Sequence, residues 1–183
     1  MTANTKKCWS VDLKVQPSRE LFSWCLNQQR VDRMLVVVRM EQQGDRYVSS
    51  PELKQLPKTL FGSSVLEEFL ASAWPGTELT GHANNSARVF LIRFDESIAE
   101  VILRTEPDLT RWLHSSSRPL PEDICLFNSS ADTPALVTVT HEELAWVIAE
   151  QKPALAGVRE TRVRPDELYW TGNDFCRHWT RGK

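Results

Sequence analysis

The chain has 183 residues, of which 41% are hydrophobic and 25% charged, and its formal net charge is −2. This ordinary globular composition allows a buried core and excludes wholesale disorder. No apolar run approaches the roughly 18–20 residues that span a bilayer, and no apolar segment follows the polar start. We therefore expect a cytoplasmic protein without a membrane partner or a secretory signal.

The first part of the chain predicts a strand, a helix, a second strand and a hairpin. Residues 9–15 alternate apolar and polar side chains, as in a half-buried strand. A helix with a one-sided apolar stripe begins at Pro17. The β-branched run at 34–40 predicts a buried central strand. A turn at 43–45 predicts a hairpin that returns at 47–48.

The next segment is interpreted as loop, helix and strand. Residues 51–57 begin and end with proline and predict a loop. Ser64 and Glu67 have the spacing of a capping box, in which each side chain binds a free backbone N–H at a helix start. That signature predicts a helix that ends near Trp74. Residues 87–94 predict a strongly apolar strand.

Two later segments each have competing interpretations. The β-branched residues within 98–104 favour a strand, whereas a helix capped by Asp95 is the alternative. Thr140 and Glu143 form a second capping box and favour a helix. The alternative there is a hairpin with a returning strand over 144–149.

The remaining elements complete a pattern of many strands with intervening helices. Residues 107–114 predict a short helix, and 124–127 and 135–140 predict two strands joined by a turn. Hairpin-type separations without regular strand–helix–strand alternation predict an α+β fold, a mainly antiparallel sheet of about five to seven strands with three to four helices packed on one face. We expect a core domain over 1–152 and a basic, aromatic C-terminal extension over 153–183, packed on the core or on a partner.

Charge is distributed unevenly along the chain. Residues 95–150 contain eleven acidic and three basic residues, a formal charge of −8. Clustered charge of one sign attracts and selects partners of the opposite sign. We therefore interpret the chain as a protein-binding module whose acidic surface, residues 95–150, engages a basic protein partner, in the manner of a bacterial toxin-immunity protein or an effector chaperone. The predicted contact residues are five acids and two tryptophans: Glu122, Asp123, Asp132, Glu142, Glu143, Trp112 and Trp146.

Two other classes of function stay open. His141 follows a predicted strand and precedes Glu142, so a small hydrolase-like enzyme with a dispersed site is one alternative. The other is an oligomerising structural domain, a homodimer formed through four aromatic residues of the extension: Tyr169, Trp170, Phe175 and Trp179.

Several kinds of site lack a recognisable pattern in the sequence. Its histidines and cysteines do not have metal-ligand spacing, and it contains no Gly-x-Ser-x-Gly nucleophile elbow. A pI of about 6.1 and the acidic block argue against a nucleic-acid partner. We therefore assign no catalytic residue, no metal ligand and no cofactor from the sequence, and favour a binding protein over an enzyme.

Overall fold

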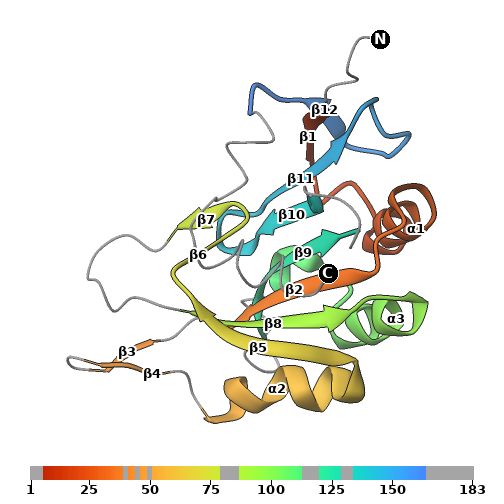
Figure 1. Cartoon of the computed structure of the whole chain (residues 1–183). Coiled ribbons are helices and arrows are strands. Elements are labelled where there is room, and N and C mark those ends of the chain that lie inside the picture. The colour runs from red at the N-terminus through yellow and green to blue at the C-terminus, as the bar shows by residue number, and fades with distance from the viewer. Residues whose placement is uncertain are drawn as a thin grey trace.

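The computed structural model describes residues 6–38, 41–43, 46–48, 51–78, 87–112, 120–128 and 134–163. These residues form one eight-stranded antiparallel sheet with three α-helices (Figure 1). The predicted α+β class is confirmed, with one strand more than the upper end of the expected range. None of the helices in this part of the chain has the length and the apolar character needed to cross a membrane.

The sheet has the strand order β12-β1-β11-β10-β9-β2-β8-β5, and each neighbouring pair is antiparallel. Its strands are Lys7–Val11 (β1), Arg33–Val38 (β2), Val65–Ala71 (β5), Ala87–Arg93 (β8), Glu122–Phe127 (β9), Pro134–Val139 (β10), Leu144–Ala149 (β11) and Val158–Glu160 (β12). Two hairpins form ladders of their own: Glu41–Gln43 (β3) with Arg46–Val48 (β4), and Ala73–Trp74 (β6) with Thr77–Glu78 (β7).

The helices pack on one face of the sheet. They are Ser18–Gln29 (α1), Pro51–Phe61 (α2) and Glu96–Thr105 (α3), and the short 3₁₀ turns are Gly62–Ser64 (η1), Leu109–Arg111 (η2) and Thr140–Glu142 (η3). Phe22 of α1, Phe61 of α2 and Ile102 of α3 are buried in one core with Met34 and Phe90 of the sheet. Full burial of each such side chain stabilises the fold by about 1.5–3 kcal/mol, so this core holds all three helices.

A second core lies on the opposite face of the sheet. Leu35 and Val37 of β2 are buried there together with Val89 of β8 and Trp74 of the β6–β7 hairpin. The central strand β2 is therefore covered on both faces, which explains its continuous apolar run and confirms the prediction of a central strand. The predicted hairpin near residue 45 is also confirmed, because Gln42 pairs with Tyr47.

The predictions for the segment before β8 are wrong. Residues 51–61 form α2, and the predicted helix after Ser64 is the strand β5. Pro57 lies inside α2, where it removes one backbone hydrogen bond, so the local sequence resembles a loop. Pairing of β5 with β8 over most of its length outweighs the capping signal at Ser64, because a cap contributes only about 1 kcal/mol.

The preferred interpretations of the two ambiguous segments are also wrong. Residues 96–105 form α3, whose start is capped by Asp95: the carboxylate accepts a hydrogen bond from the Ile98 N–H (3.0 Å). Residues 144–149 form β11, which returns antiparallel to β10 as the hairpin alternative predicts. Glu143 has a φ of 54°, a left-handed conformation that ends η3 and turns the chain.

The end of the described chain belongs to the main sheet. β12 pairs with β1, so the sheet continues past residue 152. The division of the chain at that residue stays a prediction. The predicted dimer contacts lie outside the described residues: Tyr169, Trp170, Phe175 and Trp179.

Candidate functional site

Three of the predicted contact residues are buried. The exposed fraction is 3% for Glu122 and 0% for both Asp123 and Trp112. The Trp112 indole lies in the helix-side core and donates a hydrogen bond to the Glu106 carbonyl (3.0 Å). These side chains cannot belong to a contact surface, and the prediction is corrected for them. Glu122 and Asp123 are buried because they lie on β9, which is paired on both sides and buried along its whole length.

Asp123 is the centre of a buried hydrogen-bond network. One carboxylate oxygen, Oδ2, accepts from the Trp74 indole N–H (2.7 Å) and from the Thr77 hydroxyl (3.3 Å). The other, Oδ1, accepts from the Thr140 backbone N–H (2.7 Å), and the Asp123 N–H donates to the Thr140 hydroxyl (3.2 Å). We call Asp123, Trp74, Thr77 and Thr140 the Asp123 network. It fastens the β6–β7 hairpin and the start of η3 to β9.

The backbone at Asp123 explains why polar side chains gather there. Val36 faces Ile124 while Val37 faces Glu122, so Asp123 is the extra residue of a β-bulge. Its φ is 30°, a region in which aspartate is less disfavoured than most residues. Thr138 bridges the disrupted ladder: its hydroxyl accepts from the Ile124 N–H (2.7 Å) and donates to the Ile124 carbonyl (3.1 Å). The network therefore satisfies backbone groups that the bulge would leave unpaired.

The predicted contact residues Glu142 and Glu143 are exposed, at the turn between β10 and β11. Glu143 forms an ion pair with Lys14. The pKa of Lys14 is raised, first by its hydrogen bond to Glu143 and then by the negative charges of Glu143, Asp12 and Asp108. Because η2 contacts η3, the loop that carries Asp108 lies beside this turn. We call these five residues the acidic end: Asp12, Lys14, Asp108, Glu142 and Glu143.

Exposed apolar side chains accompany the acidic end. Val15 is 56% exposed and Leu144 is 40% exposed, although both are large aliphatic residues. A groove of about 300 Å³ lies beside Leu144, lined by residues that include Asp12, Lys14, Glu143 and Arg159. Trp146, the predicted aromatic anchor, is half-buried and pairs across the sheet with Ser10, which also lines the groove. Apolar surface with charged residues around it is the usual composition of a protein contact surface.

Sequence reasoning missed Asp12 and Lys14. Lys14 and Glu143 are 129 positions apart in the chain, and only the pairing of β1 with β11 brings their segments together. The charge block therefore contains three of the five residues of the acidic end, and the other two carry no local signal.

The other acids of the block lie elsewhere. Glu150 is at the far end of β11 from Glu143, which is roughly 20 Å along a strand. Glu100 of α3 forms an ion pair with Arg19 of α1, and the hydrogen bond from Arg19 lowers the pKa of Glu100. Asp132 lies outside the described residues. The acidic block is thus divided among separate places on the structure.

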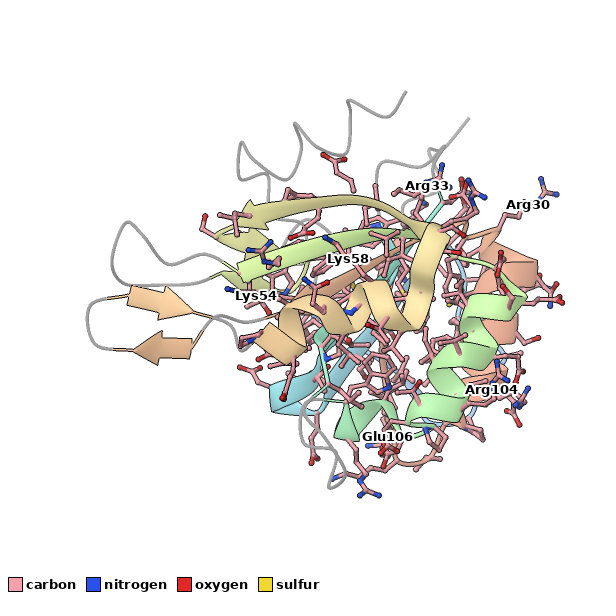
Figure 2. The ribbon with its side chains drawn as sticks, turned by 90° about the horizontal axis from the view of Figure 1, so that it is seen from below. Arg30, Arg33, Lys54, Lys58, Arg104 and Glu106 are labelled. Carbon is pink, nitrogen blue, oxygen red and sulfur yellow. The ribbon has the colours of Figure 1, made fainter. Side chains whose placement is uncertain are left out.

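Basic residues are spread over several elements on the helix side of the molecule (Figure 2). Lys54 and Lys58 project from α2, and Arg30 and Arg33 lie near the end of α1, away from Glu106. Glu106 marks the loop of the acidic end, because its carboxylate accepts a hydrogen bond from the Asp108 N–H (3.2 Å). Arg104 lies in the last turn of α3, which Glu106 ends, and Lys58 and Arg33 form ion pairs with Glu68 (2.6 Å) and Asp32 (3.5 Å), so basic and acidic residues are interspersed on this side of the molecule.

Two thiols are unsuited to nucleophilic chemistry in this structure. Cys25 and Cys125 are buried, and burial raises the pKa of both thiols, which keeps them protonated at neutral pH. Among the residues that the structure describes, no three His, Cys, Asp or Glu side chains are grouped so as to hold a metal ion. The side chain of His141 lies outside the described part, so the hydrolase-like alternative stays a prediction.

No family model matches the chain, and no curated protein and no solved structure matches it either. Any proposal for its function has to be built on the geometry and the charges described above. Of these features, the acidic end is the exposed cluster that contains predicted contact residues and has a groove beside it.

Proposed function

We propose that this chain is a protein-binding module that engages a basic protein partner through the acidic end. The observation that carries the proposal is the crowding of carboxylates around Lys14. Four carboxylates and one ammonium group give the acidic end a formal charge of −3, and counting the neighbouring Arg111 of η2 and Arg159 of the groove makes it −1. A cationic side chain of a partner would therefore meet an excess of negative charge.

The ion pair at the acidic end has little role in holding the fold together. The Lys14 and Glu143 side chains are 66% and 54% exposed, and exposed ion pairs contribute about 0–1 kcal/mol to stability. Binding a partner can therefore rearrange this pair at small cost. Complementary charge of this kind increases the rate of association and excludes acidic competitors.

The apolar residues beside the charges supply the other component of an interface. Val15 and Leu144 are exposed next to Lys14 and Glu143, and Trp146 is half-buried on the same strand as Leu144. Affinity in protein complexes comes mostly from such apolar and aromatic contacts, with charges at the rim. A cationic toxin or effector, held by an immunity protein or a chaperone, is the class of partner that fits.

The proposal is tested by capture of the partner from native lysate. The tagged full chain is compared with the double variant Glu142→Gln/Glu143→Gln and with a matched control, Glu52→Gln/Glu96→Gln, which removes two exposed acids from α2 and α3. We expect the wild type and the control to retain the same basic protein at low salt, and the acidic-end variant to lose it. Retention of that protein by the acidic-end variant, or recovery of the wild type alone, would contradict the proposal.

A further inference from the structure

The β6–β7 hairpin depends on the main sheet for its conformation. Its ladder contains only two residue pairs, Ala73 with Glu78 and Trp74 with Thr77. An isolated two-stranded hairpin of this length is not stable in water. Its position against the sheet face opposite the helices must therefore be maintained by contacts with the sheet.

The polar contacts of the hairpin converge on one atom. Oδ2 of Asp123 accepts a hydrogen bond from Trp74 on β6 and another from Thr77 on β7, so a single carboxylate oxygen fastens both strands. The turn between them lies directly on β10: a methyl group at Gly76 would be 2.8 Å from the Val139 side chain and 2.9 Å from that of Val137. The β6–β7 hairpin therefore lies across β9 and β10, and we call it the strap.

Cys125 lies beneath this strap. Its Sγ donates a hydrogen bond to the Pro75 carbonyl in the hairpin turn (3.8 Å), and its side chain is fully buried. β9 itself is held between β2 and β10, so movement of the hairpin does not require Cys125 to leave the sheet.

We infer that the β6–β7 hairpin is a strap held closed by Asp123, and that its opening exposes Cys125 as a cryptic thiol on an otherwise intact sheet. Opening is a local unfolding event, in which a short unit separates from a sheet that stays folded. Exposure to water removes the burial that disfavours the thiolate, so Cys125 becomes open to modification. An adduct on its sulfur occupies the space of Pro75 and keeps the strap from closing, which makes the device sensitive to thiol reagents.

The inference is tested with N-ethylmaleimide, to whose double bond the thiol adds without a leaving group. Labelling of the folded full chain is followed by peptide mass spectrometry, which compares Cys125 with Cys25, a buried thiol of the helix-side core. We expect Asp123→Asn to raise the labelling rate at Cys125 at least tenfold and Thr77→Val to raise it about two- to fivefold. The charge of Asp123 also raises the pKa of Cys125, so Thr77→Val, which keeps that charge, isolates the effect of the hairpin. The rate at Cys25 and the effect of a control, Thr59→Val on α2, should stay unchanged.

Two outcomes would overturn the inference. One is an unchanged rate at Cys125 in both strap variants. Another is a parallel rise at Cys125 and Cys25, which would show that labelling requires global unfolding. If Asp123→Asn fails to fold, the inference is tested with Thr77→Val and with the wild type at low urea. In both, Cys125 must be labelled well before Cys25, and simultaneous labelling would overturn the inference.

Discussion

Asp123 and Glu143 belong to the same acidic block, yet their surroundings are opposite. Asp123 is fully buried and its carboxylate accepts three hydrogen bonds, whereas Glu143 is exposed and pairs with Lys14. Thr140, which bonds to Asp123, lies three residues before Glu143. The sign of a charge in the sequence therefore does not indicate its role; access to water decides whether a carboxylate organises the fold or stays available to a partner.

The largest effect is expected from Asp123→Ala. The variant leaves the Trp74 indole, the Thr77 hydroxyl and the Thr140 N–H without their acceptor, and most of this network is buried. Each unsatisfied buried donor costs about 1–3 kcal/mol, so we expect a loss of at least 3 kcal/mol, measured by urea unfolding. A loss below about 1 kcal/mol would mean that the network relaxes or hydrates, and that the contrast with Glu143 is smaller than the structure indicates.

Asp95→Ala tests a carboxylate that is exposed but still structural. Asp95 caps α3 through the Ile98 N–H, and loss of an N-cap costs about 0.5–2 kcal/mol. The pKa of Asp95 is lowered, first by the Ser97 hydroxyl and then by the backbone N–H groups at the start of α3.

A lowered pKa means that this contribution is present above the ordinary aspartate pKa of about 3.9 and is lost as pH falls through the lower value in the folded state. We expect the stability difference between wild type and Asp95→Ala to be constant near neutral pH and to shrink below about pH 4. Denaturant unfolding across this range measures it, and a difference that persists undiminished in strong acid would contradict the capping role.

Glycine substitution separates backbone strain from side-chain contacts in the two regions. Asp123 and Glu143 both have positive φ angles, 30° and 54°. Glu143→Gly relieves this strain and removes only an exposed ion pair, so we expect a gain of about 0.5–1 kcal/mol in unfolding free energy. Asp123→Gly relieves the same kind of strain but abolishes the network, so it should destabilise. Equal signs for the two variants in thermal unfolding would refute the distinction.

The smallest effect is expected from Glu143→Gln. The exposed ion pair with Lys14 is lost, and unfolding free energy should change by less than about 0.5 kcal/mol. The pKa of Lys14 should fall, because its hydrogen bond and charge interaction with Glu143 are the main causes of its raised value. NMR titration of the Lys14 side chain in the wild type and in the variant measures this fall, and an unchanged pKa would contradict it.

The fold class could be predicted from the sequence because its strongest signals are local. The apolar run of β2 and the turn between β3 and β4 indicate strands and a hairpin without knowledge of their partners. Capping-box spacing at Ser64 and Thr140 is also a local signal, but its contribution to stability is small, so the helices that it predicts there do not form. These segments form strands because β5 pairs with β8, and β11 pairs with β10 and β1. Such pairing between distant segments cannot be predicted from a few neighbouring residues.

The candidate site could be predicted only in part. Glu142 and Glu143 follow a predicted strand and are exposed, and their role as partner contacts stays a prediction. The burial of Asp123 depends on a β-bulge, which has no sequence signature in this chain. The contribution of Lys14 depends on contacts across most of the chain length. Charge density along the sequence therefore does not show which acidic residues are exposed and which are buried.

The position of β1 in the sheet has a consequence for biosynthesis. In the described structure β1 pairs with β11 and β12, and the Trp9 indole bonds to the Ala149 carbonyl 140 residues later. At roughly 5–20 residues per second, a ribosome needs about 7–28 s to supply that partner. During this interval β1 has neither neighbour, and a nascent chain that stalls before Leu144 carries a free strand edge, a template for association with other chains.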